Sequence, residues 1–189
     1  MIDAISQERL AKVHPELARR VNKCADLLDA DGIHLRVTQG FRTWVEQTEL
    51  YRQGRTTPGI LCTHDGLTRP IGTCWDHPMG QPVTKAKAGQ SMHNFGLACD
   101  AVPDIPDLTA WYPDWSVGDV RWTDFLAKAK SCGLAEGAAW RSFPDAPHLY
   151  PEELPANPDE NMITLFNESG IEAVWAWASK QMNLSETST

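Results

Sequence analysis

The sequence predicts an α+β fold, with helices flanking a small antiparallel sheet in a single domain that carries a long inserted loop. Segments with the apolar spacing of helices alternate along the chain with short segments typical of strands. They do not recur as regular strand–helix–strand units, which disfavours a parallel sheet. No internal repeat is visible, and 189 residues suit one domain of ordinary size.

The first part of the chain predicts two helices and one strand. Apolar residues recur with helical spacing over residues 15–30, and residues 33–38 then alternate between apolar and polar, as in a half-buried strand. Thr43 and Glu46 have the spacing of a capping box, so a second helix is expected from there to about Gln53. His14 and His34 have no recognisable partners and are expected on the surface.

A long inserted loop is predicted over residues 56–89, where Pro, Gly, Thr and Asp replace any regular apolar spacing. Loops of this length within a domain are usually functional or appended. The loop contains Cys62, His64, Cys74 and His77. These four residues could form a structural zinc site, or the two cysteines could form a disulfide after release to an oxidising space. The favoured interpretation is that they are two loop cysteines and two solvated histidines.

The second part of the chain predicts three short strands and two helices. The strands are expected at residues 97–102, 138–140 and 148–150, and the helices at residues 119–132 and 168–182. Together with the earlier elements they form a domain whose core spans about residues 16–150.

Composition and charge argue against several classes of function. The formal net charge of −8 disfavours a general nucleic-acid binder and tight attachment to an anionic membrane. No segment approaches the roughly 18 apolar residues that span a bilayer, and the N-terminal residues lack the pattern of a secretory signal. We therefore expect a monomer that is made in the cytoplasm, enters no membrane, and needs another protein to release it if it acts elsewhere.

A candidate metal site lies in the stretch QSMHNFGLACDAV, residues 90–102. His93 and Asp100 are seven positions apart, which on a straight strand would separate them by more than about 20 Å. A turn at Gly96, where glycine is conformationally permissive, must fold the chain back for both to reach one ion. His148 is the best third ligand. Two imidazoles and one carboxylate suit a single catalytic zinc ion that keeps its fourth position for water.

Four further residues are candidates for catalysis or substrate binding. Asp145, three positions before His148, could take a proton from the attacking water and pass it to the leaving amine, or it could be a turn residue. Arg42 could hold a substrate carboxylate or stabilise an oxyanion, or it could simply pair with Glu46 along the helix. Gln47 could line the cleft or only pack, and Ser91 could orient a ligand or cap the turn.

Three blocks of the sequence resemble a known family of zinc peptidases. SMHNFGLACD (Ser91 to Asp100) is similar to the Ser-x-His-x-x-Gly-x-Ala-x-Asp motif of the family that includes D-alanyl-D-alanine carboxypeptidases and L-alanyl-D-glutamate endopeptidases. TQGFRTWVEQTELYRQGRTTPG (residues 38–59) and GLAEGAAWRSFPDAPHLY (residues 133–150) resemble its other two blocks, in the same order. The combination of LYRQGRTTPG, HNFGLACD and FPDAPH is most similar to the L-alanyl-D-glutamate branch, many of whose members are phage endolysins.

The resemblance implies a fold like that of hedgehog and D-Ala-D-Ala peptidases, with zinc held by His93, Asp100 and His148. It also implies Asp145 as the catalytic acid and base and Arg42 in substrate binding or transition-state stabilisation. The expected activity is hydrolysis of the L-Ala–D-Glu bond in peptidoglycan stem peptides by a bacteriolytic, phage-type endolysin that acts on the cell wall after release. The alternatives are a D-Ala-D-Ala carboxypeptidase on the same scaffold and a non-catalytic, zinc-stabilised wall-binding module.

Overall fold

The computed structural model describes most of the chain, and an antiparallel sheet lies at its centre. The described residues are 2–53, 61–64, 67–70, 73–74, 77–78, 82–105, 112–113, 117–142 and 144–183. In spatial order the sheet contains β1 (Leu35–Gln39), β6 (Cys99–Ile105), β9 (Asp145–Pro151) and β8 (Leu134–Gly137), and β7 (Tyr112–Pro113) pairs with the end of β6. All these pairs are antiparallel.

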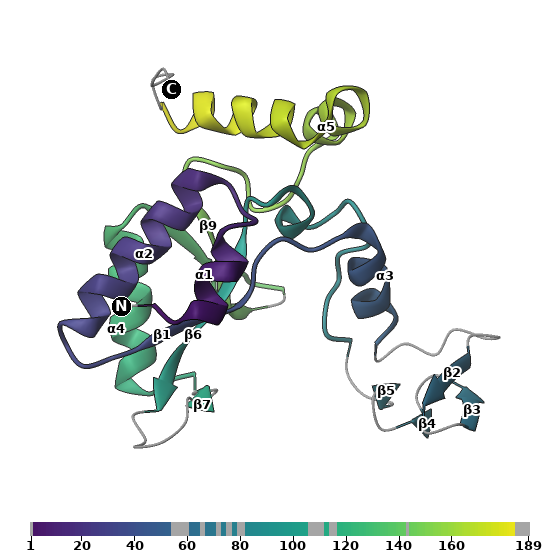
Figure 1. Ribbon diagram of the computed structural model, residues 1–189, viewed down its shortest axis with the longest axis horizontal. Coiled ribbons are helices and arrows are strands. Elements are labelled where there is room, and N and C mark those ends of the chain that lie inside the picture. Colours follow the sequence, from purple (N-terminus) through teal and green to yellow (C-terminus); the bar gives the residue numbers. More distant parts are fainter. Residues whose placement is uncertain are drawn as a thin grey trace.

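The described residues form five α-helices and one 3-10 helix. They are α1 (Ala4–Leu10), α2 (Pro15–Asp29), α3 (Trp44–Arg52), η1 (Met92–Phe95), α4 (Val120–Ser131) and α5 (Glu160–Gln181). Helices α1, α2 and α4 gather beside the sheet, whereas α5 lies across one end of the fold and α3 leads away toward two small hairpins (Figure 1). This arrangement of helices and antiparallel strands confirms the predicted α+β class. None of the helices described is both long and apolar enough to cross a lipid bilayer.

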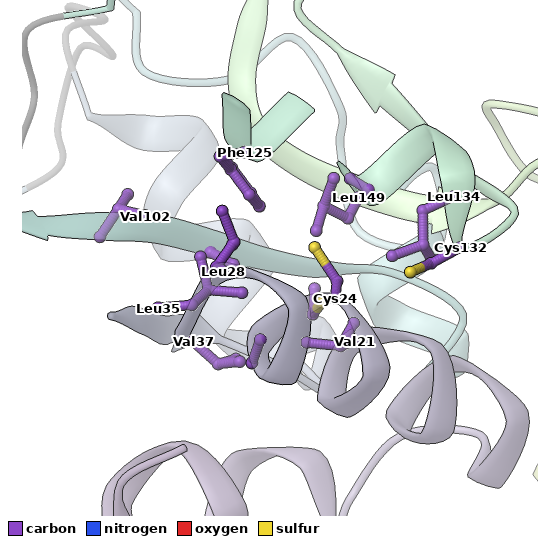
Figure 2. Packing of buried hydrophobic residues seen from close by; sticks show 14 of the residues in the cluster. Val21, Cys24, Leu28, Leu35, Val37, Val102, Phe125, Cys132, Leu134 and Leu149 are labelled. Carbon is purple, nitrogen blue, oxygen red and sulfur yellow. The ribbon is translucent and has the colours of Figure 1, made fainter. Parts of the chain in front are cut away.

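The main core lies between the sheet and the helices α2 and α4. Val21, Cys24 and Leu28 of α2 are fully buried, and they point toward Phe125 of α4 and Leu149 of β9 (Figure 2). Their spacing along α2 is the apolar stripe that the sequence predicts. The thiol of Cys24 is part of this core, and burial raises its pKa to about 12. A thiol in that state packs as a small apolar group rather than acting as a nucleophile.

A second core joins α5 to the segment that carries η1. Phe95 packs edge-on against Phe166, with their ring centroids 5.3 Å apart. Further along α5, the indole Nε1–H of Trp175 donates to the Phe95 carbonyl at 2.8 Å. Gly170 lies between these two contacts with φ 77° and ψ −174°, which breaks the helical path and lets the two parts of α5 take different directions.

Several predicted elements differ from the structure in position. The helix α1 was not predicted, and the last helix starts at Glu160 rather than at the expected residue 168. The strand expected at residues 138–140 lies earlier, in β8. The loop expected over residues 56–89 contains two short hairpins: β2 (Leu61–His64) with β3 (Leu67–Pro70), and β4 (Thr73–Cys74) with β5 (His77–Pro78).

The expectation for His14 was wrong, and that for His34 holds for its position on the surface but not for its lack of a partner. His14 is buried: its Nδ1 accepts from the backbone N–H of Glu16 at 3.1 Å, and its Nε2 lies 3.0 Å from Ser179 Oγ on α5. It therefore caps α2 and contacts the last helix, and no local sequence pattern reveals the second role. His34 is exposed, although it pairs with Asp29. The side chains of Cys62, His64, Cys74 and His77 lie outside the described part of the structure.

Candidate active site

Three side chains converge on one point at the edge of the central strands. His93 Nε2 lies 3.1 Å from Asp100 Oδ1 and 3.2 Å from His148 Nδ1, and the last two atoms are 3.3 Å apart. Two ligand atoms that each lie about 2.0–2.1 Å from a tetrahedral zinc ion are about 3.3–3.4 Å apart. The three predicted ligands are therefore brought together with the spacing of one face of a zinc tetrahedron, and they form a group that could hold a metal ion.

Local backbone structure places these three side chains. Asp100 and His148 are opposite partners in the β6–β9 ladder, so their side chains lie on the same face of the sheet. His93 lies on η1, which ends at Gly96 in the left-handed conformation with φ 64°. The glycine turn that the sequence requires between the first two ligands is thus present. A Cβ atom at Gly96 would also approach the ring of Trp175 to 3.1 Å.

A hydrogen bond to the backbone leaves the ligand nitrogen of His93 without a proton. His93 Nδ1 lies 2.8 Å from the Gly40 carbonyl, which can only accept, so Nδ1 carries the proton and Nε2 presents its lone pair. Burial lowers the pKa of His93 and so favours the neutral, ligating form. Burial by itself would raise the pKa of Asp100, but His93 and His148 hold it well below its ordinary value. The donor set therefore fits a divalent metal ion.

Arg42 lies beside the cluster and contacts the carboxylate ligand from behind. Its Nη2 is 3.4 Å from Asp100 Oδ2, and its Nη1 donates to Gln47 Oε1 at 2.9 Å. The side chain is buried, and burial lowers its pKa. The alternative role for Arg42 was an ion pair with Glu46. The Glu46 carboxylate instead accepts hydrogen bonds from Thr43 in the capping box of α3. The guanidinium is thus directed toward the candidate metal site.

Asp145 is the first residue of β9, and its side chain lies outside the ligand cluster. Burial raises its pKa, and the negative charge of Asp100 raises it further. Gly137 of β8 is its register partner, and a Cβ atom there would come within 2.5 Å of the Asp145 carbonyl. Because only glycine permits this approach, β8 helps to fix the backbone from which Asp145 projects.

A cavity of about 770 Å³ joins these groups. Its lining includes Arg42, Ser91, Asp145 and the three candidate ligands, so Ser91 is placed where it can meet a ligand. Gln47, in contrast, is fully buried behind Arg42 and does not line the cavity.

The walls of the cavity include residues that sequence reasoning missed. Lys85 and Ala86 lie on one wall, and Trp140 and Ser142 lie on another. Lys85 Nζ donates to the Ser142 carbonyl at 2.8 Å and so joins the two walls. Trp140 packs against His148, with ring centroids 4.9 Å apart. Lys85 lies within the segment without periodicity, so no sequence pattern distinguishes it from a solvated lysine.

Comparisons with known proteins agree with this geometry. Two family models, both described as D-alanyl-D-alanine carboxypeptidase, match residues 10–113 and 84–150. The chain is 31% identical over 141 residues to the peptidoglycan L-alanyl-D-glutamate endopeptidase CwlK of Bacillus subtilis (strain 168), and the match covers 72% of each protein.

Two solved structures share the fold. The L-Ala D-Glu endopeptidase ChiX of Serratia marcescens has a TM-score of 0.50 and 19% identity, covering 80% of this chain and 90% of its own. A mutant of the vancomycin resistance D,D-pentapeptidase VanY, crystallised with Zn(II), has a TM-score of 0.50 and 16% identity, covering 86% and 83%. The sequence matches and the ligand geometry lead to one conclusion: the chain belongs to the D-alanyl-D-alanine carboxypeptidase family of zinc peptidases.

Proposed function

We propose that the protein is a zinc-dependent peptidoglycan endopeptidase that hydrolyses the L-Ala–D-Glu bond of stem peptides. One observation carries the proposal: a single cavity brings Asp145 and Arg42 to the cluster of His93, Asp100 and His148. A proton carrier, a fixed positive charge and a three-ligand metal site are the groups that metal-assisted peptide hydrolysis needs.

The roles proposed for the residues follow from their positions. Bound zinc supplies a Lewis acid that polarises a peptide carbonyl and lowers the pKa of water. Asp145, whose raised pKa favours proton uptake, accepts the proton of the attacking water and delivers it to the leaving amine. Arg42 binds negative charge, either on the carbonyl oxygen as it develops or on a substrate carboxylate. His93, Asp100 and His148 hold the metal, and Ser91 contacts the substrate from the lining of the cavity.

The names of two relatives favour the L-Ala–D-Glu bond, since CwlK and ChiX are both named for its cleavage. The cavity of about 770 Å³ lies within the roughly 300–1,000 Å³ typical of ligand pockets, so it has room for a stem peptide.

The products of digestion test the proposal. Purified peptidoglycan is treated with the zinc-loaded protein, and the fragments are identified by mass spectrometry. A new D-glutamate amino terminus is expected. Release of free D-alanine would instead identify a D-Ala-D-Ala carboxypeptidase, the alternative favoured by the description of the two family models. The metal content of the same preparation checks for one zinc ion per chain.

The biological setting is also a proposal. A phage-type endolysin would act on the cell wall only after another protein has released it from the cytoplasm, and it would work as a monomer. Expression in a host with and without a membrane-permeabilising protein tests this role. Lysis is expected only when both proteins are present, and lysis by this protein alone would contradict it.

A further inference from the structure

Gln47 is buried completely, yet its side chain hydrogen-bonds to two different parts of the active site. Its Oε1 accepts from Arg42 Nη1 at 2.9 Å, and its Nε2 donates to the Ala86 carbonyl at 2.7 Å. The residue has no exposed surface and does not line the cavity. A substrate in the cavity would meet Arg42 and Ala86, but not the amide that joins them.

The two partners fix the orientation of this amide. A guanidinium can only donate and a carbonyl oxygen can only accept. Rotating the Gln47 amide by 180° would therefore replace both hydrogen bonds with repulsive contacts. Each end of the amide has one partner to which it is suited, so Gln47 couples the position of Arg42 to that of Ala86.

On one side, Gln47 holds a wall of the cavity. Residues 82–90 form no helix or strand, and residues 83–86 line the cavity. Side chains attach this segment to its surroundings: Gln47 binds the Ala86 carbonyl, Lys85 Nζ binds the Ser142 carbonyl, and Asn94 Oδ1 accepts from the Gly89 N–H at 3.0 Å. A segment held by a few side-chain contacts is released when one of them is lost.

On the other side, Gln47 holds the Arg42 guanidinium beside the metal ligands. Nη1 binds Gln47 while Nη2 faces Asp100 Oδ2 at 3.4 Å. Because the guanidinium is planar, fixing one of its nitrogens also fixes the direction of the other. Loss of the Gln47 oxygen would leave a buried charged donor unpaired, which is strongly unfavourable, and Arg42 would turn toward the cavity and solvent.

We propose that Gln47 is a positioning residue that sets both the Arg42 guanidinium and the cavity wall at residues 82–90, rather than a substrate contact. The catalytic value of this coupling rests on the function proposed above. Two substitutions of Gln47 distinguish the effect of its bond to Ala86 from that of its bond to Arg42. Gln47→Glu keeps an acceptor for Arg42 but cannot donate to the Ala86 carbonyl near neutral pH, because the guanidinium keeps the new carboxylate ionised. Gln47→Met has nearly the same shape and makes neither bond.

The experiment measures three properties of the zinc-loaded wild type and both variants. Hydrogen exchange reports on the wall through the amides of residues 84–90. NMR of arginine side chains labelled with ¹⁵N reports on rotation of the Arg42 guanidinium. Chemical denaturation reports on overall stability. The matched control is the same pair of substitutions at Gln53, which follows α3 and lies outside the cavity lining.

The expected result is a split between the two variants. Both variants should exchange the wall amides at least about tenfold faster than the wild type, but only Gln47→Met should free the Arg42 guanidinium. Gln47→Met should also lower kcat/KM for stem peptides by about tenfold or more, and the Gln53 variants should change none of these values. Unchanged wall exchange and an unchanged Arg42 signal in Gln47→Met, with only KM raised, would overturn the proposal in favour of a direct substrate contact. The exchange and NMR measurements need no substrate, so they stand apart from the digestion products that test the proposed function.

Discussion

At the scale of single residues, the surroundings of the candidate ligands and those of Asp145 favour different protonation states. Burial lowers the pKa of His93 and so favours its neutral form, whereas the contacts with His93 and His148 outweigh burial and lower the pKa of Asp100. A neutral imidazole and an ionised carboxylate are the forms that bind a metal ion. Asp145 lies on the same strand as His148, yet burial raises its pKa and so favours the protonated form. The pKa values of two carboxyl groups in one cavity are thus shifted in opposite directions, as the proposed roles of a metal ligand and a proton carrier require.

We predict that Asp145→Asn abolishes most of the activity without removing the metal. The amide is close in size to the carboxyl group but cannot accept the proton of water, so kcat should fall by about 100-fold or more. Stem-peptide hydrolysis, zinc content and thermal unfolding are measured together. Asp26→Asn, at an exposed position of α2, is the control and should behave as the wild type. Full activity in Asp145→Asn would exclude the proposed mechanism, and inactivity of the wild type itself would favour the wall-binding module.

At the scale of elements, the candidate metal site depends on one short helix and the turn that ends it. A four-residue 3-10 helix has little stability of its own, and η1 is held by contacts from other elements. The backbone N–H of Arg42 donates to the His93 carbonyl at 3.0 Å, and the N–H of His14 donates to the Gly96 carbonyl at 2.8 Å. Trp175 adds its bond to Phe95 from α5. Three distant segments therefore determine where His93 lies.

We predict that Gly96→Ala weakens zinc binding, whereas Gly32→Ala does not. Both glycines have positive φ, 64° and 75°, so each alanine should lower the free energy of unfolding by about 1–2 kcal/mol. A Cβ at Gly96 would also press on Trp175 at 3.1 Å and displace η1, but a Cβ at Gly32 meets nothing within 4 Å. Zinc competition with a chromophoric chelator and urea unfolding measure the two effects. Equal zinc affinity in the two variants would show that strain at Gly96 does not reach His93.

Elements with local sequence signals could be predicted, and those that depend on distant contacts could not. The capping box of Thr43 and Glu46 and the apolar stripe of α2 correspond closely to the observed helices. The α1 helix has only seven residues, and Leu10 is buried by packing that the sequence does not reveal. The first part of α5 follows a Pro- and Glu-rich stretch. Gly170 interrupts the helix, so the sequence did not indicate that the two parts are continuous.

At the scale of the whole molecule, Arg20 joins three segments that are far apart in sequence. Its guanidinium binds Glu16 on the same helix at 2.8 Å and both carboxylate oxygens of Glu153, at 2.7 and 2.8 Å. It also donates to the Gly133 carbonyl, between α4 and β8. Because Arg20 and Glu16 are both buried, loss of either partner leaves a buried charge unpaired, which is strongly destabilising.

We predict that this network makes the protein less stable in acid. Hydrogen bonds from Arg19 and then from Arg20 outweigh burial and lower the pKa of Glu16 from 4.5 to about 2. A carboxyl whose pKa is lower in the folded state stabilises the fold above pH 4.5, and this stabilisation is lost as the pH falls toward 2. Glu16→Gln should therefore show a smaller loss of unfolding free energy between pH 6 and pH 3 than the wild type. Glu8→Gln, in an exposed pair with Lys12, should match the wild type, and identical slopes for Glu16→Gln would contradict the prediction.

The candidate ligand triad could be predicted from residue chemistry and motif resemblance, but its surroundings could not. His93, Asp100 and His148 stand in recognisable motifs, and the structure brings them together. Gln47 could be recognised only as a polar residue near Arg42, because its complete burial depends on segments beyond its own helix. The bond from Lys85 to Ser142 joins residues that are 57 positions apart, and no local pattern predicts such a contact.

If Asp100 and His148 bind the metal as proposed, their pairing across β6 and β9 also makes metal uptake depend on correct folding. A slip of one residue between these strands would turn one of the two side chains to the opposite face. A misaligned chain would then retain most of its hydrogen-bonded ladder but lose the coordination sphere. The fraction of chains that bind the ion during refolding would therefore report the fraction in which β6 and β9 have the native register. This measurement needs no substrate.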